Sequence, residues 1–310
     1  MTVPIEISIV SPVYRAAEIV DKLVERIAEE VSKITPDYEI ILVEDRGPDN
    51  SWEKIQENCK KYPRVKGVRL SKNCGQQYAI QCGLDASVGA EVVVMDCDLQ
   101  DNPAEIYKLY AKAKEGYDIV VARRLNRKDN FFKKFLSKLF NSILGYLTET
   151  EQDSTVANFV LMNRKVVDAL KMMGDNNRYY PMMIQWIGFN KVKVDIQHAE
   201  RDVGGSSYSI RKRLSLAMDV IVTFSDKPLR LTVKLGVFIS FLSVIVAFSL
   251  IIMHLAYGVD ATGWTSLAVT NSFFSGFIIA VLGMVGLYVG KTFEGVKSRP
   301  TYIIDETENF

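Results

Sequence analysis

The sequence predicts an α/β domain with a doubly wound, mostly parallel sheet, followed by amphipathic segments and two membrane-spanning helices. In residues 1–122, short runs rich in Val and Ile alternate with amphipathic helical patterns, as parallel strands alternate with the helices that connect them. Residues 235–259 and 261–290 contain no Asp, Glu, Lys or Arg. Each run exceeds the roughly 20 apolar residues that a helix needs to cross a bilayer.

The alternation in the first part of the chain gives the order of the elements. Strands are expected where apolar residues are continuous, at 5–10, 39–43, 65–70, 91–95 and 118–122. Helices are expected where apolar residues recur with helical spacing, at 19–32, 51–60, 77–87 and 103–115. Because the strands are apolar throughout, helices should cover both faces of the sheet.

Charge and cysteine content limit the possible functions. The chain of 310 residues has 38 basic and 37 acidic side chains, and its formal net charge is +1. This balance excludes bulk electrostatic binding to nucleic acid, which needs a marked basic excess. The four cysteines form no CxxC pair, and two histidines are too few for a histidine metal site. We therefore expect reduced thiols in a cytoplasmic domain.

Positive charge flanks both apolar runs, whereas the link between them, 258–266, has no Lys or Arg. Because positive charge marks the cytoplasmic side, we expect a multi-pass protein of the cell inner (cytoplasmic) membrane. The α/β domain and both termini would then be cytoplasmic. The alternative is a pair of buried core helices. Small residues in the second run favour close helix packing in a homo-oligomer, at Gly276, Gly283, Gly286 and Gly290.

Two basic amphipathic stretches precede the apolar runs, at 131–147 and 210–222. Helices of this kind can lie on an anionic membrane surface. The alternative for each is an ordinary helix packed on the domain core. The apolar runs behind them favour contact with the membrane.

Acidic residues follow two of the expected strands, at the edge of the sheet where ligands of such folds bind. Asp96 and Asp98 come after the run 91–95, and Asp45 comes after 39–43. A divalent cation, Mg²⁺ or Mn²⁺, would offset the cost of burying these carboxylates and would also hold substrate phosphates. Gln100 offers a further oxygen ligand.

Several common catalytic motifs are missing from the sequence. It contains no GxxxxGK[ST] loop and no GxGxxG turn after a strand, which argues against a P-loop NTPase and a dinucleotide oxidoreductase. It also contains no GxSxG nucleophile elbow.

Five short motifs follow one another along the chain. They read SPVY, ED, KNCGQ, DCDLQD and RDVGGSSY, at 11–14, 44–45, 72–76, 96–101 and 201–208. This order resembles the family 2 glycosyltransferases with a GT-A fold. Together with the two terminal runs and the GLYVG ending of the second, it resembles more narrowly the polyprenyl-phosphate glycosyltransferases, namely dolichyl-phosphate mannose synthase and the GtrB-type enzymes.

The resemblance implies a role for each matching residue. The nucleotide-sugar donor would contact Pro12, Val13, Tyr14, Asp45, Lys72, Asn73, Gln76 and Asp96. The metal would be bound by Asp96, Asp98 and Gln100. The acceptor phosphate would contact Arg124, Arg201 and Ser206. The catalytic residues would be Asp96, Asp98, Arg124, Arg201 and Asn158.

The sequence departs from the family pattern in three places. The Asn-Glu after the tyrosine is Arg15-Ala16, and the Asp-Gly-Ser turn reads Asp45-Arg46-Gly47. Asn158 stands where many relatives carry an acid proposed as the base, and an amide cannot accept a proton at neutral pH. A phosphate monoester has a second pKa of about 6 and is already ionised, so Asn158 favours a phosphate acceptor. Asp153 is a candidate substitute base.

We therefore expect four regions: a GT-A domain at 1–208, amphipathic juxtamembrane helices at 209–234, two transmembrane helices at 235–290 and a cytoplasmic tail at 291–310. The acidic end of this tail, 305–310, is expected to be flexible. The expected activity is inverting transfer of a sugar from a nucleotide donor, a UDP-hexose, to an undecaprenyl-type phosphate at the cytoplasmic membrane face. The alternatives are a catalytically inactive membrane scaffold and a processive polysaccharide synthase of the same fold.

Overall fold

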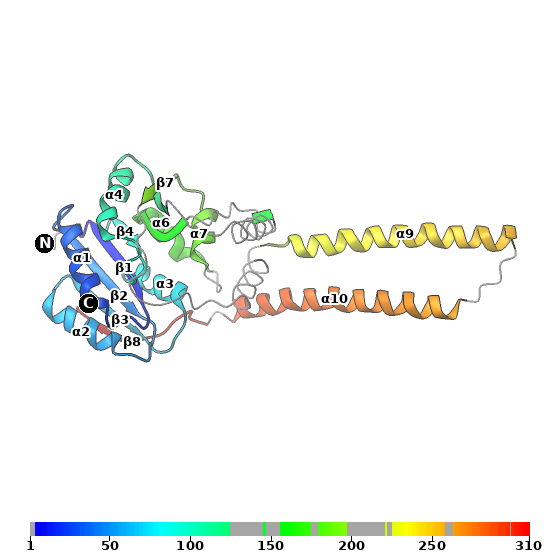
Figure 1. Cartoon of the computed structure of the whole chain (residues 1–310), viewed down its shortest axis with the longest axis horizontal. Coiled ribbons are helices and arrows are strands. Elements are labelled where there is room, and N and C mark those ends of the chain that lie inside the picture. Colours follow the sequence, from blue (N-terminus) through cyan, green and yellow to red (C-terminus); the bar gives the residue numbers. More distant parts are fainter. Residues whose placement is uncertain are drawn as a thin grey trace. The chain divides into compact units, whose positions relative to one another are not determined.

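The computed structural model describes residues 4–124, 145–146, 156–174, 179–196, 221, 225–257, 263–297 and 299–310. The chain divides into two compact units (Figure 1). The sheet unit is drawn from residues 1–141, 152–207 and 299–310, and the helical unit from 142–151 and 208–298.

Within the described residues, eight strands of the sheet unit form one sheet in the order β7-β5-β6-β4-β1-β2-β3-β8. The first five strands along the chain are β1 (Ile7–Val13), β2 (Tyr38–Glu44), β3 (Val65–Leu70), β4 (Glu91–Val94) and β5 (Ile119–Arg124). The last three are β6 (Val156–Asn163), β7 (Lys191–Ile196) and β8 (Ile304–Glu308). The five strands expected from the sequence are all present, whereas β6, β7 and β8 were not expected.

The sheet is mostly parallel, as the sequence predicts. β1 lies between β2 and β4 and pairs with both in parallel, with Ile9 opposite Ile40 on one side and Val93 on the other. β3 continues the parallel set beside β2. β6 lies antiparallel between β4 and β5, and β7 is parallel to β5. The carboxyl ends of β1, β2 and β4 consequently meet at one edge.

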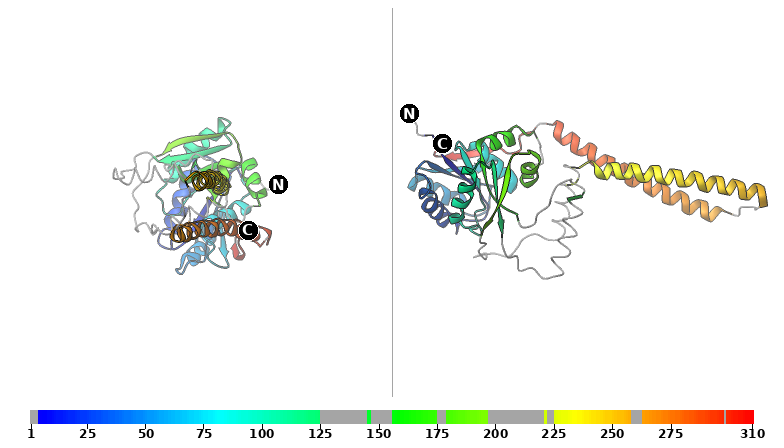
Figure 2. Two further views of the ribbon diagram at one scale, coloured as in Figure 1. Left: turned by 90° about the vertical axis from the view of Figure 1, so that its right-hand side faces the viewer. Right: turned by 90° about the horizontal axis from the view of Figure 1, so that it is seen from above.

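Helices cover both faces of this sheet (Figure 2). One face carries α1 (Val20–Ser32), α2 (Ser51–Lys61), the short 3₁₀ turn η1 (Pro103–Glu105) and α4 (Ile106–Lys114). The other carries α3 (Gln76–Ala86), which packs on β1 and β2, and α6 (Arg164–Met172), which packs on α3 and β4. The short helix α7 (Tyr180–Trp186) follows α6.

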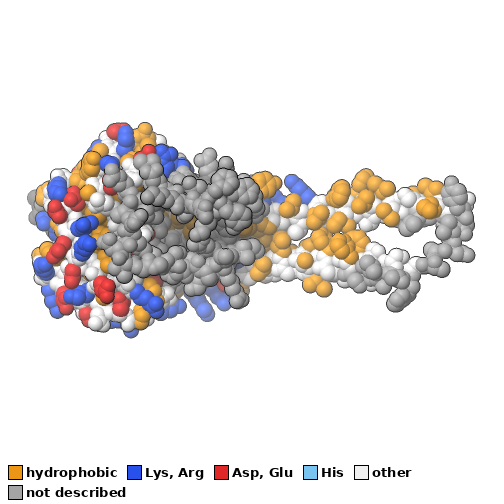
Figure 3. Space-filling model, viewed as in Figure 1, with side chains coloured by type: hydrophobic (Ala, Val, Ile, Leu, Met, Phe, Trp, Pro, Cys, Tyr) orange, Lys and Arg blue, Asp and Glu red, His pale blue; other side chains and the backbone are white. Residues whose placement is uncertain are grey.

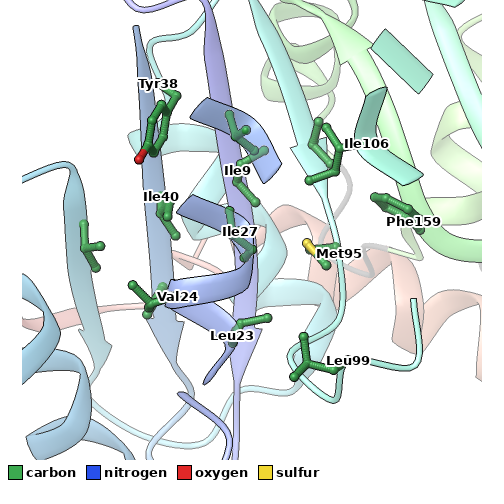
Figure 4. Packing of buried hydrophobic residues seen from close by; sticks show 14 of the residues in the cluster. Ile9, Leu23, Val24, Ile27, Tyr38, Ile40, Met95, Leu99, Ile106 and Phe159 are labelled. Atoms are coloured by element: carbon green, nitrogen blue, oxygen red, sulfur yellow. The ribbon is translucent and has the colours of Figure 1, made fainter. Parts of the chain in front are cut away.

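The main hydrophobic core lies under α1, α2 and α4 (Figure 4). Leu23 and Ile27 of α1 pack with Ile9 of β1 and Ile40 of β2, all of them fully buried. Burial explains both the helical spacing of apolar residues along α1 and the apolar character of the strands. The side chains on this face lose their contact with water on folding.

The predicted flexible tail is wrong. β8 instead pairs antiparallel with β3 and forms the edge of the sheet, with Thr307 opposite Val68. Side chains of β8 and the following residue bind β3 and α2: Glu308 accepts from Gln56 Nε2 at 2.8 Å, and Asn309 Nδ2 donates to the Val65 carbonyl oxygen at 2.9 Å. The acidic side chains of this segment, which predicted a solvated tail, instead bind polar groups that are far away in the sequence.

The helical unit contains α9 (Lys227–Tyr257) and α10 (Trp264–Val296), which confirms the two long apolar helices. Segments of both are long and apolar enough to cross a membrane, and neither segment is buried within the protein. Hydrophobic side chains lie along both helices (Figure 3). α9 begins eight residues before the charge-free run, at Lys227, whose ammonium lies 4.4 Å from the centroid of the Tyr146 ring. Tyr288 donates to the Ser225 carbonyl oxygen at 2.7 Å.

Two predictions fall mostly outside the described residues. Of the two amphipathic stretches, 131–147 and 210–222, the structure describes only residues 145, 146 and 221. Their placement on a membrane surface therefore stays a prediction. The separate juxtamembrane region at 209–234 also stays a prediction, although its last residues, 227–234, form the start of α9.

Gly83 tests the close packing of α3 on the sheet. A Cβ at this position would lie 2.2 Å from Val10 Cγ1 and 3.3 Å from Val43 Cγ2. Gly83→Ala is expected to destabilise the sheet unit by about 1–3 kcal/mol, the usual cost of overpacking. Thermal unfolding of the full chain measures this. The matched control is Gly174→Ala, whose Cβ meets nothing within 4 Å, and equal melting temperatures for the two variants would contradict the packing.

Candidate active site

The predicted site residues gather where β1, β2 and β4 end. Pro12 and Val13 are the last two residues of β1 and are buried, and the Tyr14 side chain that follows is 44% exposed. Asp45 follows β2 directly, and Asp96 lies two residues beyond β4. Since β1 pairs with both β2 and β4, these segments are neighbours at one edge of the sheet.

Asp45 joins two of these segments. Its side chain is buried, and its two carboxylate oxygens accept hydrogen bonds from the backbone N–H groups of Cys74 at 2.7 Å and Gly75 at 2.8 Å. Asn73 Nδ2 donates to the Asp45 carbonyl oxygen at 2.9 Å. Burial raises the pKa of Asp45, and the two N–H donors oppose that rise. The structure therefore shows Asp45 as the anchor of the segment that leads into α3. We call this segment the 72–76 loop; its last residue, Gln76, is the first residue of the helix.

The 72–76 loop connects Asp45 to the acidic turn. Gly75 has φ +99°, a left-handed conformation that favours glycine. The chain then enters α3, where Gln76 Nε2 donates to Asp96 Oδ1 at 2.6 Å. Lys72, Asn73 and Gln76 are all exposed at this edge. Four residues that the resemblance assigns to a donor are thus brought together with Asp96.

The acidic turn at 96–101 is anchored in the core by Leu99. This side chain is buried in the cluster under α1, although its backbone has the left-handed φ of 56° (Figure 4). Asp96, Asp98 and Gln100 are partly exposed, and Asp98 Oδ1 accepts from the Gln100 N–H at 3.2 Å. With Leu99 turned inward, Asp98 before it and Gln100 after it remain partly exposed at the sheet edge.

Cys97 lies between the two carboxylates but is not suited to bind a metal. Burial, together with the charges of Asp96 and Asp98, raises the pKa of its thiol to about 12. A thiol is a metal ligand only as the thiolate, so Asp96 and Asp98 supply the anionic oxygens here. No group of three or more His, Cys, Asp or Glu side chains converges in the part of the chain that the structure describes. A cation bound by two carboxylates would take its other ligands from phosphates and water, as Mg²⁺ usually does.

The structure explains the departure at Arg15-Ala16. Ala16 is buried, and its N–H donates to Ser51 Oγ at 3.0 Å, so a charged side chain would not be accommodated here. Arg15 has φ 52° and its guanidinium lies 5.4 Å from the centroid of the Tyr14 ring. The neighbouring Ala17 N–H donates to Asp49 Oδ2 at 3.1 Å. These bonds hold the segment after β1 on the segment after β2.

The predicted acceptor residues are only partly described. Asn158 lies on β6 two residues before Val160, which pairs with Val94 of β4, so Asn158 is at the same edge as Asp96. Arg124 is the last residue of β5 and its backbone lies opposite Ile196. Arg201, Ser206 and Asp153 lie outside the described residues.

Two acidic side chains at this edge, Glu44 and Asp305, were given no role by the sequence reasoning. Glu44 is buried, accepts a hydrogen bond from the Gly47 N–H and lies 3.3 Å from Arg69 Nε. Burial raises its pKa despite these partners. Asp305 binds Arg46, with 2.6 Å between Arg46 Nη1 and Asp305 Oδ2. No local pattern indicates the second pair, because its members lie 259 residues apart.

Comparison with known proteins identifies the family. The family described as glycosyl transferase family 2 matches residues 8–170, which include the ends of β1, β2 and β4 and the acidic turn. The chain belongs to glycosyl transferase family 2. The uncharacterized glycosyltransferase YkcC of Bacillus subtilis (strain 168) is 36% identical over 98% of this chain and 94% of its own length. The undecaprenyl-phosphate 4-deoxy-4-formamido-L-arabinose transferase of Proteus mirabilis (strain HI4320) is 31% identical over 97% and 93%.

Solved structures support the same fold. Glucosyl-3-phosphoglycerate synthase from Mycobacterium tuberculosis, crystallised with Mn²⁺, UDP and glucosyl-3-phosphoglycerate, superposes with a TM-score of 0.51 at 15% identity. That similarity covers 70% of this chain and 78% of the other. Mannosyl-3-phosphoglycerate synthase from Rubrobacter xylanophilus gives 0.50 at 17% identity, with 73% and 74% covered. The predicted GT-A-like, mostly parallel fold of a family 2 glycosyltransferase is therefore confirmed.

Asp45→Asn tests the anchor of the 72–76 loop. An amide keeps one acceptor oxygen but presents an N–H₂ donor to a second backbone donor, which costs about 1–3 kcal/mol. Tryptic cleavage after the exposed Lys72 should therefore become faster, by roughly fivefold or more. The same measurement on Glu18→Gln, an exposed position, provides the control. Equal cleavage rates in wild type and Asp45→Asn would show that the loop does not depend on this carboxylate.

Proposed function

We propose that this glycosyltransferase moves a sugar from a nucleotide donor, a UDP-hexose, to an undecaprenyl-type polyprenyl phosphate at the cytoplasmic face of the membrane. The observation that carries the proposal is the match to an undecaprenyl-phosphate transferase over 97% of this chain. That match extends beyond the sheet unit into α9 and α10. An enzyme with a soluble acceptor would have no need of two membrane-spanning helices such as α9 and α10.

The donor is assigned to the edge formed by β1, β2 and β4. The exposed ring of Tyr14 offers a face for the base, beside Pro12 and Val13, and the 72–76 loop borders the same edge. Asp96, Asp98 and Gln100 would hold Mg²⁺ or Mn²⁺ on the diphosphate. When bound, this cation stabilises the charge of the leaving nucleoside diphosphate. Its presence is supported by the donor set and by the Mn²⁺ and UDP found together in the structural neighbour.

The acceptor phosphate is assigned to Arg124, Arg201 and Ser206. With a second pKa of about 6, a phosphate monoester is largely a dianion at neutral pH. Its oxygen would attack the anomeric carbon in line as the bond to the diphosphate oxygen breaks, which inverts the configuration. No proton has to be removed, so Asn158 is compatible with turnover. Two guanidinium groups would hold the phosphate by charge-assisted hydrogen bonds.

A lipid acceptor would also explain why the chain contains α9 and α10. A polyprenyl tail stays in the bilayer, so an enzyme that uses it must work at the membrane surface. We propose that α9 and α10 span the inner membrane with both ends cytoplasmic, as their flanking charges indicate. Association of spans through their small residues would give a homo-oligomer.

The test is transfer of label into lipid. The full chain in detergent, with undecaprenyl phosphate and Mn²⁺ or Mg²⁺, is offered a panel of radiolabelled nucleotide sugars, and label extracted into organic solvent is counted. Asp98→Ala is expected to lower the rate at least about 100-fold, because charge stabilisation of the leaving group is lost. Asp168→Ala, at an exposed position on α6 where the carboxylate lies 3.9 Å from Arg164 Nη1, should retain the wild-type rate.

The other outcomes separate the alternatives. Donor binding without label from any donor would favour the catalytically inactive scaffold. Absence of donor binding would contradict the assignment of the site. Label that forms in Asp98→Ala at the wild-type rate would contradict the role of the acidic turn.

A further inference from the structure

The last residues of the chain lie against the predicted donor site. We call residues Arg299–Phe310 the C-terminal strap; they follow α10 in sequence and belong to the sheet unit. The strap meets the 72–76 loop at its base, where the Ser71 N–H donates to the Ile303 carbonyl oxygen at 2.9 Å. Its other contacts reach the segment after β2 and the helix α3.

The first of these contacts is the ion pair between Asp305 and Arg46. Arg46 follows the loop anchor Asp45 and has φ 48°, which an L residue adopts only where its surroundings hold it. Its Nη1 lies 2.6 Å from Asp305 Oδ2. The side chains of Arg46 and Asp305 are 41% and 42% exposed. The strap therefore restrains the residue that directly follows Asp45.

Glu306 reaches the same segment through a second route. It accepts from Arg69 Nη1 at 3.1 Å and from Trp52 Nε1 at 3.2 Å. Arg69 in turn lies beside the buried Glu44, which binds the Gly47 N–H. Neighbouring residues of β8 thus support residues 44–47 from two directions.

A third contact holds α3. Tyr302 donates its hydroxyl to Asp85 Oδ2 at 2.7 Å, and Asp85 Oδ1 accepts from Gln81 Nε2 at the same distance. Burial raises the pKa of Tyr302, so its hydroxyl remains a donor throughout the physiological range. The other end of α3 begins with Gln76, which binds Asp96. All three contacts therefore lead to segments that form the predicted donor site.

We propose that the C-terminal strap is a positioning element of the donor site, with Asp305 as the positioning residue that acts through Arg46. The strap holds residues 44–47 and the 72–76 loop in the conformation that binds the nucleotide, so that donor affinity depends on it while the chemical step does not. This proposal rests on the proposed function. It also gives a partner to Arg46, which stands where the family pattern has the glycine of Asp-Gly-Ser.

The experiment compares Asp305→Ala with Glu308→Gln in the full chain. Glu308 lies on the same strand but binds Gln56 of α2, away from residues 44–47, so its variant is the matched control. Binding of UDP with Mn²⁺ is measured by calorimetry, and kcat and both KM values by lipid labelling. Asp305→Ala should raise the UDP Kd and the donor KM about two- to fivefold, the range of an exposed ion pair. Because uniform binding is lost, kcat and the acceptor KM should not change.

A double-mutant cycle tests the route through Arg46. If Asp305 acts through this guanidinium, the variant with both Arg46→Ala and Asp305→Ala should bind UDP no more weakly than the weaker single variant. A merely structural role of the strand would instead shift the melting temperatures of Asp305→Ala and Glu308→Gln alike and leave UDP binding equal in the two.

The failures of the two proposals are distinguishable. Wild-type protein that binds UDP, with Asp305→Ala binding it equally well, overturns the strap proposal alone. A fall in kcat at an unchanged donor KM overturns it as well. Wild-type protein that binds no nucleotide or nucleotide sugar overturns both proposals.

Discussion

The carboxylate of Asp45 accepts hydrogen bonds from the backbone N–H groups of Cys74 and Gly75, and this pair of bonds fixes the loop that borders the candidate active site. The carboxylate is buried, so its charge is tolerated only because those donors face it. Gly75 can present its N–H because its φ of +99° suits a residue without a side chain. From there the chain enters α3, and Gln76 reaches Asp96.

The remaining features of the site follow from the parallel sheet around this interaction. β1 between β2 and β4 brings three strand ends to one edge, and Leu99 anchors the acidic turn in the core beneath. The carboxylates of Asp96 and Asp98 therefore lie on a segment that is anchored in the core. The strap from the C-terminus adds further ionic contacts at the β3 side of the same edge.

The sequence predicts an element well when the element depends on residues that are close together in the chain. The five parallel strands, the four helices among them and the two long apolar helices follow from patterns within a few residues, and the structure contains them all. β8 could not be predicted in this way, because its acidic residues become a strand only through partners such as Arg69 and Gln56. The acidic turn was predicted correctly at a strand end. That Asp45 binds a backbone loop was not, since the direction of those N–H groups depends on the conformation of Gly75.

A structure of the full chain with UDP and Mn²⁺ would show whether this edge of the sheet binds the nucleotide while Asp45 keeps its loop in place. We expect a cation between the diphosphate and the carboxylates of Asp96 and Asp98, a base beside Tyr14, and the hydrogen bonds from Cys74 and Gly75 to Asp45 unchanged. A nucleotide bound elsewhere, or an Asp45 side chain that leaves these N–H groups to bind the cation, would contradict it.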